Sequence, residues 1–341
     1  MGITVAIFAA WLIAGCASKK GPKSTTDYWP ESKPAQKLDR RGDEIMVAGQ
    51  LFHTGAPVIL WTDPGGYDAY RTERRFAPLA KSDYAATTQE VKGINSPNRY
   101  GMRRSVLTTQ QAEQVRGGGW PLDLLQDKVD QFVIHYDVCG TAAQCFFILH
   151  DVRDLSVHFM LDVDGTIYQT LDLKKRAWHA TIANSRSVGI EIANIGAYGV
   201  NSSDNPLEQW YPHDSTGKRR LALPIYVKKG NLPADFVGRP IREEAVVGEI
   251  QGKQLRMYDL TPQQYASLTR LTATLCKVFP KIKCDYPKDE QGKLIPHKLS
   301  REQLDAYQGV LGHYHIDTGK TDPGPAFQWD RVINGARALM K

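Results

Sequence analysis

Short apolar runs separated by polar turns dominate the middle of the chain. Residues 131–134 form a run suited to a buried strand, and His135 stands at its carboxyl end. Residues 188–193 form a second apolar run. Residues 157–163 and 166–170 flank a two-residue Asp-Gly turn, which predicts a β-hairpin.

A helical period replaces the strand pattern in two places. Residues 142–152 are expected to form one helix. Residues 261–264, Thr-Pro-Gln-Gln, have the spacing of a capping box with proline at the first helical position, which predicts a second helix. Apolar side chains then recur on one helical face until Pro280 stops the pattern: Tyr265, Leu268, Leu271, Leu275 and Val278. We expect a loop of about 30 residues after it, and then a strand that ends near Leu311.

Three segments have a different composition. Residues 16–44 are rich in Lys, Ser, Pro, Asp and Arg, which is typical of a flexible tether. Residues 45–125 are expected to form an ordered extension that packs on the main domain, with short strands at residues 46–52 and 58–61. Residues 197–258 are polar with scattered Pro and Gly, and we interpret them as a long insertion. No internal repeat is present.

The first residues predict export. Residues 3–14 are almost wholly apolar but shorter than the about 20 residues that span a bilayer, which is the length of a signal-peptide core. They lead into Ile-Ala-Gly-Cys, which resembles a bacterial lipobox, so residues 1–15 are interpreted as a lipoprotein signal peptide and Cys16 as the lipidated residue. The alternative is a plain secretory signal followed by a free cysteine. No Asp follows Cys16, which favours the outer membrane, facing the periplasm, over the inner membrane.

The remaining cysteines form an even set. Lipidation of Cys16 leaves Cys139, Cys145, Cys276 and Cys284 out of the five cysteines of the chain. In an exported protein this favours two disulfides, and we expect the local pairing of Cys139 with Cys145 and of Cys276 with Cys284. Free thiols at some of these positions are the alternative.

Composition narrows the range of partners. The chain has 341 residues, 42% hydrophobic residues and a formal net charge of +6. The positive charge is spread along the chain without a basic block, so we expect no nucleic-acid partner. A mildly basic surface suits an anionic polymer such as a cell wall.

One loop concentrates side chains that bind metals. Residues 312–325 follow the last predicted strand and contain two His, two Asp and a Lys before the rigid sequence Asp-Pro-Gly-Pro. Loops of this composition after a buried strand are often functional. The alternative is a surface loop in which these residues have no common role.

Four motifs occur in a characteristic order. They are residues 133–135 (Val-Ile-His), 176–180 (Arg-Ala-Trp-His-Ala), 187–191 (Ser-Val-Gly-Ile-Glu) and the 312–325 loop. Together they resemble the N-acetylmuramoyl-L-alanine amidase family, which includes the anhydromuramoyl-peptide amidases and is related to peptidoglycan recognition proteins. The resemblance implies an α/β fold with a mixed central β-sheet flanked by helices, over a zinc amidase domain of residues 126–341.

The resemblance also implies a metal site. One Zn²⁺ ion would be held by His135, His313 and Asp322, two imidazoles and a carboxylate that leave a fourth position open for catalysis. Asp322 stands where some relatives carry cysteine, which favours the anhydromuramoyl-peptide amidase branch. Glu191 would accept the proton of the attacking water. The alternative for Glu191 is a side chain that points outward to solvent.

Two further residues have expected roles at the same site. The resemblance places Lys320 to stabilise the oxyanion of a tetrahedral intermediate, and the alternative is a solvated loop lysine. His179 would line the groove and bind substrate, or else be a hydrogen-bonded structural histidine. His315 is a weaker candidate ligand, and His158 is expected to be structural because it alternates with apolar residues.

The expected activity is hydrolysis of the amide between N-acetylmuramic acid and L-alanine in peptidoglycan or muropeptides. We expect a monomer with only a lipid anchor in the membrane. Two alternatives stay open: a peptidoglycan-binding module without catalysis, and a zinc hydrolase that cleaves an amide of the stem peptide.

The lipid anchor can be tested directly. A Cys16→Ala variant should be unlipidated and should move from the membrane fraction to the soluble fraction, because the acyl chains would have no thiol to attach to. Membrane fractionation with mass spectrometry of the N-terminal peptide measures this. A variant that stays with the membranes as the wild type does would contradict the lipobox interpretation.

Overall fold

A computed structural model describes residues 38–71, 100–117 and 119–341, and Cys16 and the signal segment lie outside them. The strands are β1 (Glu44–Val47), β2 (Gln50–His53), β3 (Val58–Leu60), β4 (Tyr100–Gly101), β5 (Gln131–Tyr136), β6 (Phe159–Leu161), β7 (Ile167–Gln169), β8 (Arg176–Ala177), β9 (Ser187–Ile192), β10 (Tyr198–Gly199), β11 (Val246–Ile250), β12 (Lys253–Met257) and β13 (Gly309–Gly312). The α-helices are α2 (Thr109–Arg116), α3 (Leu122–Lys128), α4 (Ala142–Phe146), α5 (Leu207–Trp210), α6 (Pro262–Val278), α7 (Arg301–Ala306) and α8 (Trp329–Met340). Among the described residues, no helix combines the length and apolarity needed to cross a membrane.

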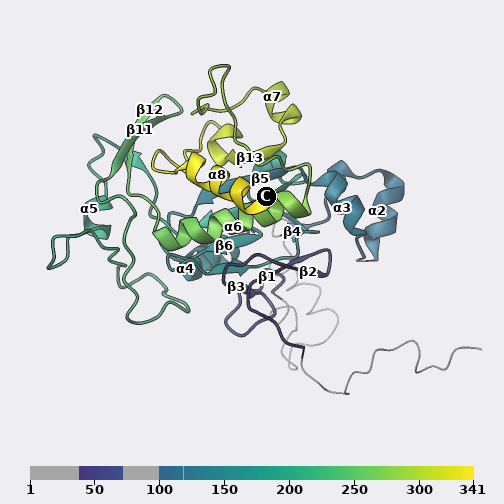
Figure 1. Cartoon of the computed structure of the whole chain (residues 1–341), viewed down its shortest axis with the longest axis horizontal. Helices are drawn as coiled ribbons and strands as arrows, with labels where there is room; N and C mark the ends of the chain where they lie inside the picture. Colours follow the sequence, from purple (N-terminus) through teal and green to yellow (C-terminus); the bar gives the residue numbers. More distant parts are fainter. Residues whose placement is uncertain (1–37, 72–99, 118) are drawn as a thin grey trace, which may run out of the picture. The chain divides into compact units, whose positions relative to one another are not determined.

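A six-stranded sheet forms the centre of the fold (Figure 1), in the order β13-β5-β9-β6-β7-β3. The first four of these strands run parallel to one another, β7 is antiparallel to β6, and β3 is parallel to β7. The sheet is therefore mixed, and the expected fold class is confirmed. The predicted hairpin over residues 157–170 is the β6–β7 pair, with strands shorter than the apolar runs.

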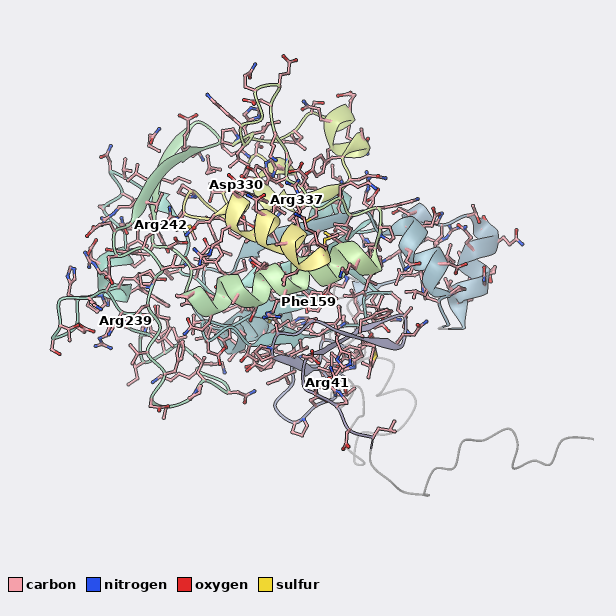
Figure 2. All side chains as sticks on the ribbon, viewed as in Figure 1. Arg41, Phe159, Arg239, Arg242, Asp330 and Arg337 are labelled. Atoms are coloured by element: carbon pink, nitrogen blue, oxygen red, sulfur yellow. The ribbon has the colours of Figure 1, made fainter. Side chains whose placement is uncertain are left out.

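One face of the sheet carries a continuous apolar layer. Side chains alternate between the two faces of a strand, so Phe132 and Ile134 of β5 share a face with Val188 and Ile190 of β9. Helices α6 and α8 pack against each other over this face, and Phe159 of β6 lies beneath α6 (Figure 2). The apolar stripe of α6 belongs to the same core, which is why this helix forms where its spacing predicts.

The opposite face is apolar for part of its length and polar at one end. Val133 and Met160 point to this side and pack in two smaller clusters, one of which contains α4 and the helical segment after it. By alternation His135 and Glu191 also face this side, at the carboxyl ends of their strands. The predicted helix over residues 142–152 is present, and its second half, Phe147–Val152, is wound as a π-helix.

Three helices in the last third of the chain, α6, α7 and α8, contribute buried side chains to the core. The capping box of α6 is present, because the Thr261 side chain accepts a hydrogen bond from the Gln264 backbone and the Gln264 side chain accepts one from Thr261. The loop expected between α6 and β13 contains α7, which begins with a capping box of its own at Ser300. Helix α8 buries one face, formed by Trp329, Val332, Ile333 and Ala336. The sequence interpretation did not predict α7 or α8.

The segment before residue 126 does more than pack on the domain. Residues 46–52 are not one strand, because Ala48 and Gly49 both adopt positive φ and fold the run into the β1–β2 hairpin. The expectation of a strand over residues 46–52 was therefore wrong in detail. Strand β3 pairs with β7 as the edge strand of the central sheet. The extension thus contributes a strand to the main sheet.

The insertion of residues 197–258 has its own small sheet, in the order β10-β12-β11. It builds a cluster around buried Trp210 and Tyr258. Arg242 lies in this region (Figure 2) and donates to the Asp259 carboxylate at 2.6 Å, which ties the insertion to the segment before α6. The insertion is therefore an ordered part of the domain.

A buried carboxyl group gives the fold a pH dependence. Asp162 is fully buried after β6, where one carboxyl oxygen accepts from the Val163 backbone and the other has no partner among the described residues. Burial, above all, raises the pKa of Asp162 to about 8. Between its unfolded pKa near 3.8 and this value, the folded chain binds one more proton than the unfolded chain, so stability decreases as the pH rises.

We therefore expect Asp162→Asn to stabilise the fold near pH 7.5 and to change it little near pH 4. The amide keeps the acceptor for Val163 and carries no charge that burial would penalise. Urea unfolding in the presence of a chelator should show a gain of about 1–3 kcal/mol at the higher pH. A gain of the same size at both pH values would show that ionisation of Asp162 has no part in it.

Candidate active site

Three parallel strands bring the candidate residues level with one another. Strand β13 pairs with β5 so that Gly312 lies opposite Ile134, which puts His313 and His135 in adjacent positions just beyond. On the other side of β5, His135 lies directly opposite Glu191 of β9. The carboxyl ends of parallel strands meet at one edge of a sheet, and three residues distant in sequence therefore meet there.

Asp322 completes the group from the loop that follows β13. The loop turns back on itself, because the Tyr314 backbone N–H donates to the Asp322 carbonyl at 3.2 Å. A Cβ on Gly312 would lie 2.7 Å from Pro323, so glycine allows this close approach. The loop is also held from outside, since the Gln251 side chain donates to the carbonyls of Tyr314 at 2.8 Å and Asp317 at 3.1 Å.

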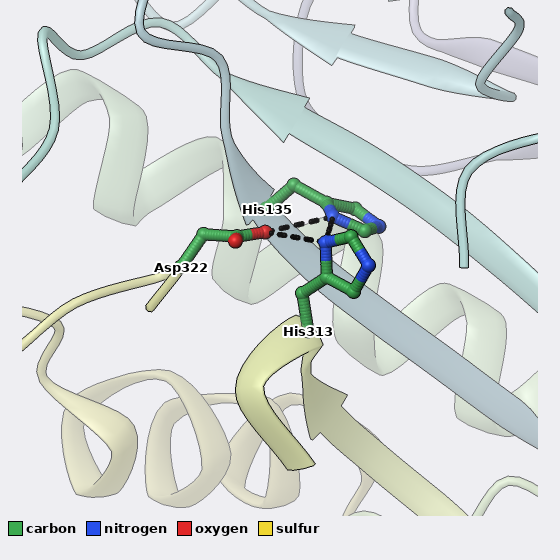
Figure 3. A group of neighbouring side chains, drawn as sticks. All are labelled: His135, His313 and Asp322. Atoms are coloured by element: carbon green, nitrogen blue, oxygen red, sulfur yellow. Dashed lines mark hydrogen bonds and ion pairs between the residues drawn. The ribbon is translucent and has the colours of Figure 1, made fainter. Parts of the chain in front are cut away.

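The three predicted ligand atoms converge on one point (Figure 3). His135 Nδ1 lies 2.9 Å from Asp322 Oδ2, His313 Nδ1 lies 3.0 Å from the same oxygen, and the two Nδ1 atoms are 3.0 Å apart. All three residues are buried. The structure thus brings together His135, His313 and Asp322 as the sequence predicted.

The pKa values of His135 and Asp322 favour the protonation states in which these side chains bind a metal. Burial lowers the pKa of His135 to about 4, helped by the charge of His313 and opposed by the Asp322 carboxylate, so the ring is neutral at pH 7. Burial alone would raise the pKa of Asp322, but the two histidines outweigh it and hold it well below its ordinary value. Neutral imidazole and ionised carboxylate are the forms that bind a metal.

The donor set fits a zinc ion. Ligand bonds of 2.0–2.2 Å in tetrahedral geometry separate neighbouring donor atoms by about 3.3 Å, and the observed triangle is only slightly smaller. The second nitrogen of His135, Nε2, has a partner of its own in His179 Nδ1 at 3.0 Å. Metal-binding histidines commonly have such a partner, which fixes the ring and its tautomer.

A cavity of about 260 Å³ is lined by His135, His313 and Asp322, and Glu191 lines it as well. Burial raises the pKa of Glu191 well above its ordinary value, and Asp322 and Asp137 add to this, while Lys320 opposes it. The side chain is half-buried and contributes to the cavity wall, so it does not point outward to solvent. Lys320 lines the cavity as well, two residues before Asp322, and is half-buried.

His179 occupies a different position from the one expected of a residue that only contacts substrate. Its ring borders the cavity, but Nδ1 is bonded to His135 and Nε2 lies 3.3 Å from the Ser187 hydroxyl. The residue is thus both a wall of the groove and a support of a ligand. Sequence reasoning placed it at the site and missed the contact with His135, which requires the β8–β9 loop to lie over β5.

The other two histidines lie away from the ligand group. His315 accepts from the Gly312 backbone at 2.9 Å through Nδ1, and its Nε2 lies 2.8 Å from the Ile295 carbonyl, so it is a structural residue. His158 is fully buried and accepts from the Gly189 backbone through Nδ1, which leaves Nε2–H to donate to the Lys175 carbonyl. The structural interpretation of His158 is confirmed. Sequence reasoning missed Trp178 and Arg153, which also line the cavity.

The four described cysteines are free thiols that lie in the expected local pairs. Burial, then a hydrogen bond from Cys139, raises the pKa of Cys145 far above its ordinary value. A hydrogen bond between Cys276 and Cys284 raises the pKa of the first and lowers that of the second. Each thiol therefore has its predicted partner beside it, and the two disulfides themselves stay predictions.

Such a His-His-Asp group at the carboxyl ends of parallel strands, with a glutamate beside it, defines a candidate centre for hydrolysis. The sequence pattern of the N-acetylmuramoyl-L-alanine amidase family matches residues 125–325, and the chain belongs to this family. The match includes every residue of the candidate site. Membership supports the activity of an amide hydrolase that acts on peptidoglycan.

Individual proteins are also similar to this chain. The 1,6-anhydro-N-acetylmuramyl-L-alanine amidase AmpD of Haemophilus influenzae is 23% identical over 222 residues, which cover 65% of this chain and 74% of that protein. A crystal structure of a selenomethionine derivative of AmpD matches 72% of this chain and 92% of its own, at 19% identity and a TM-score of 0.32. The Escherichia coli amidase AmiD, solved with anhydro-N-acetylmuramic acid-L-Ala-D-γ-Glu-L-Lys, matches 64% of this chain and 59% of its own, at 18% identity and a TM-score of 0.33.

The ligand assignment makes a direct prediction. Asp322→Ala should abolish stoichiometric zinc binding, because two imidazoles without the carboxylate lose one of three ligands and the negative charge that favours a cation. Metal analysis of the purified protein measures this, with Asp317→Ala in the same loop as the matched control. Full zinc occupancy in Asp322→Ala would rule out the assignment.

Proposed function

We propose that this protein is a zinc-dependent N-acetylmuramoyl-L-alanine amidase, which hydrolyses the amide between N-acetylmuramic acid and the L-alanine of the stem peptide. The observation that carries the proposal is the convergence of His135 Nδ1, His313 Nδ1 and Asp322 Oδ2 within 2.9–3.0 Å of one another, beside Glu191. A peptidoglycan-binding protein without catalysis has no use for a buried donor set with an adjacent proton acceptor.

His135, His313 and Asp322 would hold one zinc ion at the cavity that they line. Zinc bound there would supply Lewis acidity, which activates water for attack and polarises an amide carbonyl. The chain contributes two imidazoles, a carboxylate and the His179 contact that orients His135.

Glu191 and Lys320 then divide the remaining chemistry. Glu191 accepts a proton from the attacking water and delivers it to the leaving nitrogen, a role for which a carboxyl pKa raised by burial is suited. Lys320 lines the same cavity, in the loop that carries Asp322, and stabilises the negative charge that develops on the carbonyl oxygen.

The substrate class follows from the family and the cavity. The relatives are amidases of muramyl-L-alanine compounds by their names, and the AmiD structure contains an anhydromuramyl tripeptide. The cavity wall here combines the aromatic Trp178 with the cationic Lys320 and Arg153, which suits a sugar ring joined to an acidic peptide. The substrate is therefore peptidoglycan or its muropeptide fragments.

The remaining sequence interpretations belong to the same proposal. A lipid on Cys16 and a tether over residues 16–44 would hold an amidase domain of residues 126–341 at the periplasmic face of the outer membrane, where its substrate lies. That compartment would allow the Cys139–Cys145 and Cys276–Cys284 disulfides to form. The first of these would brace the cavity wall, because both its cysteines line the cavity.

Digestion of purified muropeptides with mass spectrometry of the products tests the activity. We expect free stem peptide and an intact glycan, and a Glu191→Gln variant should retain zinc and lose about 10²–10⁴-fold in kcat because its amide cannot accept a proton. Glu249→Gln, an exposed position on β11, is the matched control and should behave like the wild type.

The products of the digestion distinguish the amidase from the alternative functions. Cleavage within the stem peptide would replace the proposal with a peptidase. If protein that is shown to contain zinc cleaves nothing, the proposal is wrong and the protein is a peptidoglycan-binding module without catalysis. Full activity in Glu191→Gln would show that Glu191 is not the proton acceptor.

A further inference from the structure

A fully buried arginine from the extension lies behind the active site. Arg103 precedes α2 and lies before residue 125, where the match to the amidase family begins. Its side chain has no exposure to solvent. Burying a guanidinium is costly unless its N–H groups are satisfied, so its partners indicate what it holds.

All the hydrogen bonds that Arg103 donates to oxygen go to backbone carbonyls. Nε and one terminal nitrogen donate to Leu173 at 3.2 and 2.8 Å. The other terminal nitrogen donates to Asn184 at 3.3 Å, Ser185 at 3.0 Å and Ser187 at 2.9 Å. These carbonyls stand at the beginning and the end of the segment 173–187, so one side chain clamps both ends of it.

The extension contacts the same segment twice more. Strand β4 pairs with β8, so that Gly101 lies opposite Arg176 and Tyr100 opposite Ala177. The Ser105 hydroxyl donates to the Ser185 hydroxyl at 2.6 Å. Residues 100–105 therefore hold the segment that carries Trp178 and His179, the motif of the cavity wall.

Two residues of the clamped segment fix His179 in turn. The Asn184 side chain accepts from the backbone N–H groups of His179 at 3.0 Å and Ala180 at 2.6 Å. The Ser187 hydroxyl lies 3.3 Å from His179 Nε2. The carbonyls of both Asn184 and Ser187 are bonded to Arg103.

The strand beneath has a glycine where the His179 ring approaches it. A Cβ on Gly189 would lie 2.4 Å from the His179 ring, so glycine in β9 allows this close approach. From there His179 Nδ1 reaches His135 Nε2 at 3.0 Å. A continuous chain of contacts thus runs from Arg103 through Asn184 and Ser187 to His179, and then to a predicted ligand.

We infer that Arg103 is a positioning residue of the zinc site: it holds the segment 173–187 so that His179 can orient the ligand His135. The inference rests on the proposed function, because it concerns the ligand set of that site. It assigns a role to the extension of residues 45–125, and it explains why an arginine that carries five donors is buried there. Outer partners of ligating histidines typically contribute 10–100-fold to metal affinity.

The test is a double-mutant cycle on zinc affinity, measured by competition with a chromogenic chelator at a temperature where every variant is folded. His179→Ala and Arg103→Lys should each weaken zinc binding by about 10–100-fold, because lysine keeps the charge but cannot reach both ends of the segment. The double variant should bind zinc about as weakly as His179→Ala alone, since two residues that act along one path are not additive. Arg104→Met, the exposed neighbour, should match the wild type.

A merely structural role makes a different prediction. It would lower the unfolding midpoint of the zinc-free protein and leave the zinc affinity of folded Arg103→Lys unchanged, which would overturn the inference. Losses that add up in the double variant would also overturn it. In both cases a wild type that binds zinc and cleaves muropeptides leaves the proposed function intact, whereas a wild type that binds no zinc refutes both.

Two further variants keep the test decisive if Arg103→Lys does not fold. Asn184→Ala removes the bond between the clamped segment and the His179 backbone, and Gly189→Ala displaces the ring from below. Each should weaken zinc binding, and neither should weaken it further when combined with His179→Ala. Wild-type affinity in both would show that the position of His179 does not matter to His135.

Discussion

The parallel register of β13, β5 and β9 is the constraint on which the site depends. Side chains alternate between the faces of a strand, so a slip of one residue in β5 would turn His135 into the apolar layer beneath α6. The apolar side chains of β5 and β9 prevent that slip, because they would lose their burial. The same packing that stabilises the sheet therefore fixes the distance between His135, Glu191 and the start of the His313 loop.

Two carboxyl groups at this edge have opposite electrostatic environments. Both Asp322 and Glu191 experience burial that raises the pKa, but Asp322 lies against two imidazoles that more than reverse it. For Glu191, burial and repulsion from Asp322 and Asp137 outweigh the opposing charge of Lys320. The two carboxyl groups therefore have pKa values displaced in opposite directions, a division that active sites with paired carboxyls commonly use.

The parts of the chain outside the four motifs support the loops of the site. Gln251 of the insertion is bonded to the loop that carries Asp322, and Arg103 of the extension is bonded to the segment that carries His179. Loops need such external contacts, because their own backbone groups cannot be satisfied by a regular ladder. The extension and the insertion thus each hold a loop that carries candidate site residues.

The sequence by itself predicted most strands of the central sheet and helix α6, since each depends on local pattern. The mixed sheet and the candidate ligands came from the resemblance of four motifs to a family. The sequence did not determine the β1–β2 hairpin, where backbone conformation at Ala48 and Gly49 breaks an apparently continuous strand. Only the tertiary structure shows that His179 is bonded to His135 and that His315 is structural. It also shows that Arg103 is bonded to the segment that carries His179. The roles of His179 and Arg103 depend on contacts between segments more than 40 positions apart, and that of His315 on a contact 20 positions away. No periodicity along one segment records which other segment will pack against it.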